Sequence, residues 1–229
     1  MPAARETVLI LGGTAEAAAL AARLAGEGGL RVITSLAGRT ADPASLEGEV
    51  RTGGFGGVEG MIAYFEAEGI TQVYDATHPF ARTISAHATE ACARLRLPLM
   101  RLERPVWQQE PGDDWRPCQS LEAAVNALPS GATAFLALGR QHIDVFSRRS
   151  DCRFLLRMVD APLAPLPFAK YELAIGKPSP DPDSEMALMQ RHGITHLVCR
   201  NSGGAAGYGK IEAARRLAIP VLLINRAQD

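Results

Sequence analysis

A segment near the N-terminus, residues 8–24, constrains the fold more than any other part of the chain. Residues 8–11 form a continuous apolar run, which is typical of a parallel strand that is buried on both faces. Gly12 and Gly13 follow this run, and apolar residues then recur with helical spacing over 17–24. The segment therefore predicts a strand, a tight turn and a helix.

The turn between this strand and helix has the features of an anion-binding site. Gly12 and Gly13 let a ligand approach the backbone closely, and Thr14 can cap the helix and donate its hydroxyl. The free N–H groups of the first helical turn favour an anion, so we expect these three residues to bind a phosphate. The turn lacks the G-x-G-x-x-G pattern of dinucleotide-binding proteins, and taken alone it fits an ordinary strand-to-helix turn equally well.

The loop after the next predicted strand, residues 31–35, indicates which dinucleotide such a turn would bind. In dinucleotide folds an acidic residue about 20 positions beyond the glycines binds the ribose 2′-OH, whereas an arginine there accommodates a 2′-phosphate. This loop has no acid and offers Ser35, Arg39 and Thr40. The loop therefore favours NADPH over NADH, with a surface arginine beside a turn as the alternative.

Two further loops follow predicted strands at 50–52 and 72–76. Because open parallel sheets bind ligands beyond the carboxyl ends of their strands, both loops are expected at the ligand side of the sheet. In the first loop, glycines leave room for a flat ligand or phosphate beside Phe55. The alternative is a flexible turn in which Phe55 packs into the core. The candidate cofactor residues in the two loops are Gly53, Gly54, Phe55, Asp75, Thr77, His78 and Pro79.

A stretch without usable periodicity separates two series of strands and helices. We place a linker at 105–117, between an NADP(H)-binding α/β domain at 1–104 and a second α/β domain at 118–229. The sequence thus predicts an α/β fold with two Rossmann-like parallel-sheet domains and the active site in the cleft between them. The predicted strands cover 8–11, 31–35, 50–52, 72–76, 97–101, 133–138, 152–158, 171–175, 196–200 and 221–224.

The loop at 200–210 is the second candidate functional stretch. Asn201 and Ser202 present hydrogen-bonding groups, and Arg200 and Lys210 supply positive charge. Four glycines keep the loop open for a close ligand. A flexible, solvated turn is the alternative interpretation.

Charge and cysteine pattern exclude several classes of function. The formal net charge is −1, so no whole-molecule field attracts nucleic acid or an anionic membrane. No signal-peptide core precedes the first strand and no window has the length of a membrane span, so we expect a cytoplasmic protein. The four cysteines lack C-x-x-C spacing and are expected to be buried, and Gly193 separates His192 from His196, so no metal site is expected.

Five motifs, taken together and in this order, resemble the precorrin-6A reductase family of cobalamin biosynthesis along nearly the whole chain. The Gly-Gly-Phe-Gly-Gly and Asp-Ala-Thr-His-Pro-Phe-Ala segments are the specific ones. One departure is Arg200, where the family commonly has a lysine; arginine keeps the charge but does not readily donate a proton. The motifs are Gly-Gly-Thr-Ala-Glu at 12–16, Ser-Leu-Ala-Gly-Arg at 35–39, Arg-Thr-Gly-Gly-Phe-Gly-Gly at 51–57, Asp-Ala-Thr-His-Pro-Phe-Ala at 75–81 and Asn-Ser-Gly-Gly at 201–204.

The resemblance implies an enzyme that passes a hydride from NADPH to precorrin-6A, or to its cobalt form, and adds a proton to give precorrin-6B. His78, Tyr208 and Lys210 are the candidate proton donors, beside an ordered water or a substrate carboxylic acid. Hand-over of the tetrapyrrole to neighbouring pathway enzymes is a further expectation. The candidate substrate-binding residues, chosen to meet the acetate and propionate groups, are Arg82, Arg140, Lys177, Arg200, Asn201, Ser202 and Gly203.

Two other classes of protein are alternatives to this interpretation. A short-chain dehydrogenase would carry the Tyr-x-x-x-Lys acid pair, but neither Tyr171 nor Tyr208 has a lysine four residues later. A non-catalytic carrier or sensor would bind NADP(H) or a tetrapyrrole without turnover, and it remains the alternative to an enzyme.

Overall fold

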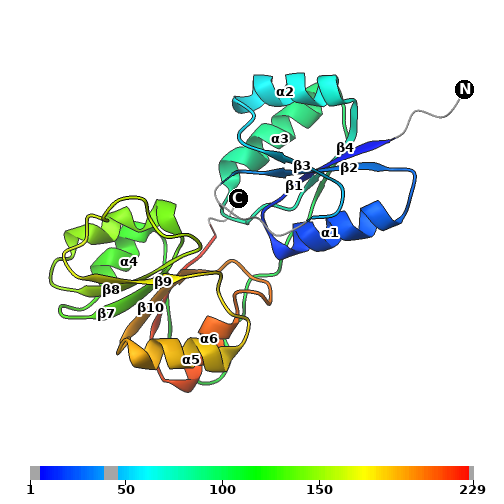
Figure 1. The fold of residues 1–229 in the computed structure, drawn as a ribbon. Helices are drawn as coiled ribbons and strands as arrows, with labels where there is room; N and C mark the ends of the chain where they lie inside the picture. The colour runs from blue at the N-terminus through cyan, green and yellow to red at the C-terminus, as the bar shows by residue number, and fades with distance from the viewer. Residues whose placement is uncertain (1–5, 39–45, 227–229) are drawn as a thin grey trace, which may run out of the picture. The chain divides into compact units, whose positions relative to one another are not determined.

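The structure is a computed structural model that describes residues 6–38 and 46–226. The chain divides into two compact units, Met1–Glu103 and Arg104–Asp229, each with its own parallel sheet (Figure 1). Two parallel-sheet α/β domains were predicted, and this is confirmed. Two residues of the expected 2′-phosphate pocket, Arg39 and Thr40, lie outside the described residues.

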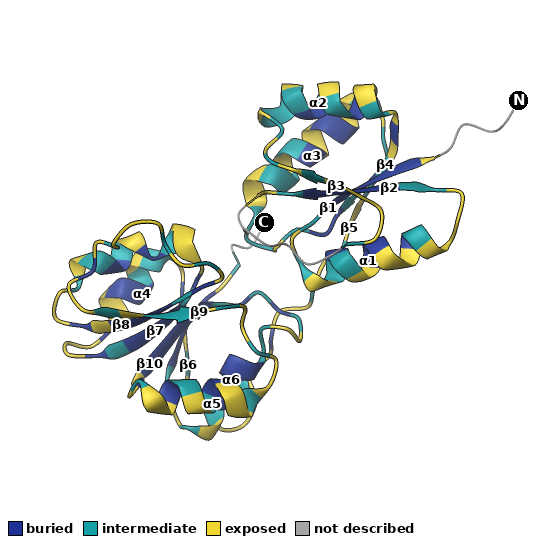
Figure 2. Ribbon diagram, in the orientation of Figure 1, coloured by how far each residue is buried: buried dark blue, intermediate teal, exposed yellow. Residues whose placement is uncertain are grey.

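The first unit is a five-stranded sheet with helices on both faces (Figure 1). Alternate residues of the first strand face opposite ways: Val8 and Ile10 pack against one helix, whereas Leu9 and Leu11 pack against two others. Figure 2 shows β1 coloured as buried, with α1 on one face of the sheet and α2 and α3 on the other. The strand order is β3-β2-β1-β4-β5, so the order reverses between β1 and β4. In chain order the elements are β1 Thr7–Leu11, α1 Ala15–Gly26, β2 Arg31–Leu36, β3 Glu49–Thr52, α2 Gly57–Glu68, β4 Ile70–Asp75, α3 Arg82–Leu95 and β5 Leu99–Arg101.

The second unit is a six-stranded parallel sheet in the order β6-β11-β10-β7-β8-β9, with the reversal between β7 and β10. Helices α5 and α6 cover one face, and their apolar residues pack with the strands and with Trp107. The elements are β6 Trp115–Cys118, α4 Leu121–Ala127, β7 Thr133–Ala137, the 3-10 helices η1 Arg140–His142 and η2 Asp144–Arg148, β8 Arg153–Met158, β9 Tyr171–Ile175, α5 Pro182–Arg191, β10 His196–Arg200, α6 Gly209–Arg216 and β11 Val221–Ile224.

The stretch expected to be a linker, 105–117, is part of the second unit instead. Trp107 is 8% exposed and lies in the core of that unit. Residues from Trp115 onward form β6, an edge strand that pairs only with β11. Pro117 lies within this strand, which an edge position tolerates because one side of the strand makes no ladder hydrogen bonds.

The N-terminal cap of α5 is Asp181, whose carboxylate accepts from the N–H groups of Asp183 and Ser184. The cysteines Cys92, Cys118, Cys152 and Cys199 are buried, as expected. Burial raises the pKa of the Cys92 and Cys199 thiols to about 11.

Within the described residues no helix is long and apolar enough to cross a bilayer.

Candidate functional site

The glycine turn after β1 lies where the strand order of the first sheet reverses, between β1 and β4. Gly12 is held against β2: its N–H donates to the Ser35 carbonyl at 2.9 Å, and a Cβ on it would meet Thr34 Cγ2 at 2.8 Å. Gly13 has φ +101° and no atom within 4 Å of where a Cβ would be. One glycine therefore permits close packing, and the next leaves open space beside the backbone.

Thr14 joins the turn to both α1 and β4. Its hydroxyl oxygen accepts from Ala17 N at 3.1 Å, and its hydroxyl donates to the Ala76 carbonyl at 2.7 Å. The hydroxyl proton is thus used inside the fold, so Thr14 shapes the turn. The remaining N–H groups in the first turn of α1 and the positive end of its dipole suit an anion.

The loop after β4 is organised by the carboxylate of Asp75, which is 6% exposed. Asp75 Oδ1 accepts from the hydroxyl of Thr77 at 2.7 Å and from its backbone N–H at 3.2 Å, and Oδ2 lies 3.9 Å from Arg101 Nε. Asp75 and Thr77 therefore position the loop that carries His78 and Pro79.

His78 is the exposed titratable side chain of this loop. Its Nδ1 accepts from the N–H of Phe80 at 3.3 Å, which puts the proton of a neutral ring on Nε2. The His78 carbonyl accepts from Ala81 N at 2.7 Å in the turn that leads into α3. The ring of His78 is thereby presented beyond the carboxyl end of β4.

Arg51, which was not among the predicted site residues, contacts four of them. It lies opposite Ser35 in the register of β2 and β3. Its guanidinium donates to Ser35 Oγ at 2.8 Å and to the carbonyls of Gly53 and Gly54, both at 3.0 Å, and lies 3.9 Å from the ring centroid of Phe55. An arginine two residues before Gly-Gly, near a strand end, was the sequence signal that could have revealed it.

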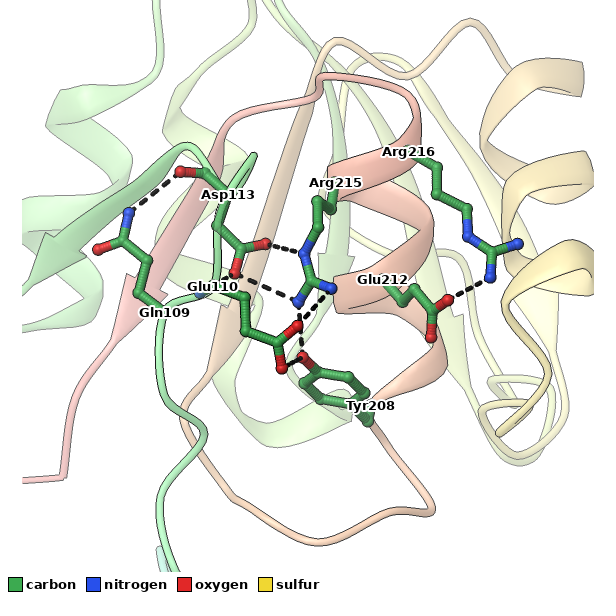
Figure 3. Close-up of polar contacts among 7 residues, drawn as sticks. All are labelled: Gln109, Glu110, Asp113, Tyr208, Glu212, Arg215 and Arg216. Carbon is green, nitrogen blue, oxygen red and sulfur yellow. Dashed lines mark hydrogen bonds and ion pairs between the residues drawn. The ribbon is translucent and has the colours of Figure 1, made fainter.

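In the second unit, Tyr208 belongs to a cluster of charged side chains (Figure 3). Its hydroxyl donates to Glu110 Oε1 at 3.0 Å and accepts from Arg215 Nη2 at 2.6 Å. Arg215 also pairs with Asp113 Oδ1 at 2.9 Å and with Glu110 Oε2 at 2.8 Å. Desolvation raises the pKa of Tyr208. The cluster ties the segment around 110–113 to α6.

Lys210 is buried, with 6% of its surface exposed. Its Nζ donates to the Gly207 carbonyl and lies 4.8 Å from the centroid of the Trp107 ring. Burial lowers its pKa, because desolvation disfavours the ammonium. Lys210 therefore lies inside the second unit rather than on an open loop.

The loop after β10 is tied to Trp107 by Asn201. Asn201 Oδ1 accepts from Trp107 N at 2.8 Å and its Nδ2 donates to the Trp107 carbonyl at 3.2 Å, while Trp107 Nε1 donates to the Gly204 carbonyl at 2.9 Å. Arg226 donates to the carbonyls of Asn201 and Ser202. The amide of Asn201 thus fixes the loop, and sequence reasoning had assigned neither Trp107 nor Arg226 to it.

The four candidate carboxylate-binding cations come from different strand ends. Arg82 begins α3 in the first unit and is exposed. In the second unit Arg140 follows β7, Lys177 follows β9 and Arg200 ends β10, so these three lie along the carboxyl edge of the second sheet. Arg140 and Lys177 are exposed, and partial burial lowers the pKa of Arg200.

A buried ion pair lies near the same edge and was not predicted. Glu185 of α5 is 1% exposed; its Oε1 accepts from Arg157 Nη1 of β8 at 2.5 Å and from Ser179 N at 2.9 Å. The pair thereby fixes the loop that carries Lys177. Within the described ranges, no group of three or more His, Cys, Asp or Glu side chains is arranged to hold a metal ion.

Comparison with known proteins gives matches along almost the whole chain. A family model described as precorrin-6x reductase CbiJ/CobK matches residues 7–229. The chain is 43% identical to the precorrin-6A reductase of Rhodobacter capsulatus over 96% of this chain and 87% of that protein. It is 44% identical to the precorrin-6A reductase of Rhodococcus erythropolis, over 96% of this chain and 88% of that protein.

A more distant relative and a solved structure extend this comparison. The chain is 28% identical to the cobalt-precorrin-6A reductase of Priestia megaterium over 96% of this chain and 90% of that protein. A structure described as CobK precorrin-6A reductase matches with a TM-score of 0.93 and 43% identity, covering 97% of this chain and 89% of that chain. Both sheets and nearly all of the loops described above fall within these matches.

Proposed function

The chain belongs to the precorrin-6x reductase CbiJ/CobK family, and on this basis we propose that NADPH is its hydride donor and that the glycine turn after β1 binds it. The enzyme is an oxidoreductase that reduces precorrin-6A, a tetrapyrrole intermediate, in the biosynthesis of cobalamin. Its reaction adds a hydride and a proton across one double bond of the macrocycle.

The observation that carries the assignment of the cofactor site is the pair of glycines at the reversal of strand order. Gly12 is packed against β2, Gly13 leaves open backbone, and the N-terminus of a 12-residue helix follows directly. These residues fit a pyrophosphate, because backbone N–H groups and the helix dipole are offered without a side chain in the way. We assign Gly12, Gly13 and Thr14 to the pyrophosphate, with Thr14 as the residue that holds the turn.

The other cofactor residues follow from their places along the same edge. Ser35, Arg39 and Thr40 bind the 2′-phosphate in this proposal, and the loops after β3 and β4 frame the nicotinamide end. NADPH supplies the hydride when bound. The protein residues contribute by holding the macrocycle in position and by excluding water. The loop residues concerned are Gly53, Gly54, Phe55, Asp75, Thr77, His78 and Pro79.

We assign the proton donor to His78. Its exposed ring carries the Nε2 proton beyond the carboxyl end of β4, the strand beside the glycine turn in the sheet. The Tyr208 hydroxyl donates to Glu110, and one N–H of the Lys210 ammonium donates to the Gly207 carbonyl, both within the second unit.

Substrate binding is assigned to the cations and loop at the carboxyl edge of the second sheet, together with Arg82. The macrocycle carries several carboxylates, and arginine binds carboxylates in a bidentate geometry. Asn201 and Gly203 act by shaping the loop: a Cβ on Gly203 would lie 2.1 Å from the Pro105 carbonyl oxygen, so this close approach requires glycine. The proposed set is Arg82, Arg140, Lys177, Arg200, Asn201, Ser202 and Gly203.

The test is NADPH oxidation, followed at 340 nm, on mixing the purified protein with enzymatically generated precorrin-6A. Consumption of NADPH coupled to a change in the tetrapyrrole spectrum is expected, with NADH and a sample without protein as controls. Equal rates with NADH would contradict the cofactor assignment. If the protein binds NADPH but reduces neither the metal-free nor the cobalt-containing substrate, a carrier or sensor would be favoured instead.

A further inference from the structure

We propose that Arg51 binds the 2′-phosphate of NADPH and is the residue that selects this cofactor over NADH. The proposal rests on the use of NADPH argued above and adds a residue from a strand that the expected pocket did not include. Arg51 is the penultimate residue of β3, which ends at Thr52, and it lies near the carboxyl edge of the first sheet.

The position of Arg51 beside Ser35 is the first observation. In Rossmann-like folds the group that recognises the ribose 2′ position lies at the end of the second strand. Here that strand is β2, and Ser35, which is 6% exposed, lies next to its last residue. Arg51 is the register partner of Ser35, and its Nη1 donates to Ser35 Oγ at 2.8 Å. The guanidinium therefore lies where a Rossmann-like fold would bind a 2′-phosphate.

The second observation is that the guanidinium is held in a fixed orientation. It lies 3.9 Å from the ring centroid of Phe55 and 4.9 Å from that of Tyr64, within the range of cation–π attraction. The carbonyls of Gly53 and Gly54 accept from Nη1 and Nη2, both at 3.0 Å. Because the side chain is already ordered, little rotamer entropy remains to be lost on binding an anion.

The third observation concerns the donors that remain on Arg51. A guanidinium has five N–H groups, and three of those of Arg51 donate to Ser35, Gly53 and Gly54. Within the described residues the Nε–H and the second Nη2–H make no hydrogen bond, and no carboxylate pairs with Arg51. These two N–H groups form one edge of the guanidinium, the arrangement that binds phosphate oxygens in a bidentate manner.

The alternative is that Arg51 only supports the glycine-rich loop. That role predicts that removing the arginine weakens the binding of every adenine nucleotide equally, since the displaced loop would affect each of them in the same way. A direct contact with the 2′-phosphate predicts selective weakening of nucleotides that carry this group. The two roles therefore differ in a ratio of dissociation constants.

The experiment is isothermal titration of the full-length protein with adenosine 2′,5′-bisphosphate and with 5′-AMP. The wild-type protein is expected to bind the bisphosphate more tightly. Arg51→Gln is expected to raise the dissociation constant of the bisphosphate about 10- to 100-fold, because charge-assisted hydrogen bonds are lost. It is expected to change the dissociation constant of 5′-AMP less than about 3-fold. Arg51→Lys, which keeps the charge without the bidentate edge, is expected to fall between the two.

Arg94→Gln is the matched control, because Arg94 is an exposed arginine of the same unit that pairs with Glu59 and Glu90. It is expected to bind both nucleotides as the wild type does. Equal weakening of both nucleotides in Arg51→Gln and Arg51→Lys, or an unchanged ratio, would overturn the role of Arg51 and leave the use of NADPH standing. A wild-type protein that binds the two nucleotides equally would overturn the use of NADPH itself.

Discussion

At the scale of single residues, Gly12 and Gly13 are adjacent, but the structure requires glycine at the two positions for different reasons. Gly12 is required by packing, since Thr34 Cγ2 would lie 2.8 Å from its Cβ. Gly13 is favoured by backbone conformation, since its φ of +101° strains any L side chain while the space around it is open. The sequence indicated a turn at this point, but only the fold identifies which neighbour each glycine meets.

Gly12→Ala is expected to lower the free energy of unfolding by about 1–3 kcal/mol, the usual cost of overpacking, and to weaken NADPH binding. The double variant Gly12→Ala/Thr34→Ser removes the methyl group that the new Cβ would meet, so it is expected to recover part of both losses. Urea unfolding and NADPH titration measure these effects. No recovery in the double variant would show that Thr34 is not the source of the cost.

His78→Asn is expected to lower kcat for precorrin-6A reduction about 100- to 10,000-fold, the range typical of losing a general acid. The dissociation constant of NADPH is expected to rise about 10-fold at most, much less than kcat falls, because His78 borders the nicotinamide end but its proton is used in the transition state. Steady-state kinetics and NADPH titration provide the two readouts. A variant that keeps its kcat would return the role to a water molecule or a substrate carboxylic acid.

At the scale of elements, periodicity predicted most strands and helices because their apolar residues repeat within a few positions. The strand β1 and the helices on both faces of its sheet follow from such local patterns. The strand β6 was missed because it is short, contains Pro117 and pairs only with β11, which is about 100 residues away along the chain. A strand of this kind is defined by its partner rather than by its own sequence.

The same limit applied to the candidate site. Loops at strand ends were identified from glycines and polar residues, which are local signals. The contacts of Tyr208 with Glu110 and of Asn201 with Trp107 join positions far apart in the chain, so no spacing rule reveals them. The sequence therefore indicated candidate loops, whereas the fold was needed to show which of their residues hold the loop through contacts with distant parts of the chain.

Arg215→Gln is expected to lower the free energy of unfolding of the second unit by about 2 kcal/mol, between the values for exposed and buried ion pairs. Asp113, whose side chain is 1% exposed, would lose its cation. Arg216→Gln is the matched control, because Arg216 pairs with Asp183, whose side chain is 79% exposed, and its loss is expected to cost less than about 1 kcal/mol. Chemical denaturation measures both, and equal costs would contradict the role given to the cluster in Figure 3.

At the scale of the whole molecule, the two units are built on one plan. Each has a parallel sheet, and in each the candidate residues lie at or beyond the carboxyl ends of its strands. Each unit also has its own buried core. Separate cores allow separate folding, which leads to a direct prediction.

A fragment of residues 1–103 is expected to fold alone, unfold cooperatively on heating and bind NADPH. Circular dichroism and titration measure this. A fragment of residues 1–69 serves as the control: it lacks β4, which pairs with β1 in the middle of the sheet, and is expected to remain unfolded. A folded 1–103 fragment that does not bind NADPH would contradict the assignment of the cofactor to the first unit.

The clamp between Trp107 and Asn201 has a mechanical consequence. The first unit ends at Glu103, and only residues 104–106 precede the position where the backbone of Trp107 is bonded on both sides to the Asn201 amide. Because the N–H and the carbonyl of Trp107 are both bonded to one side-chain amide, the 201–204 loop cannot shift within the second unit unless these two hydrogen bonds break or Trp107 moves with it.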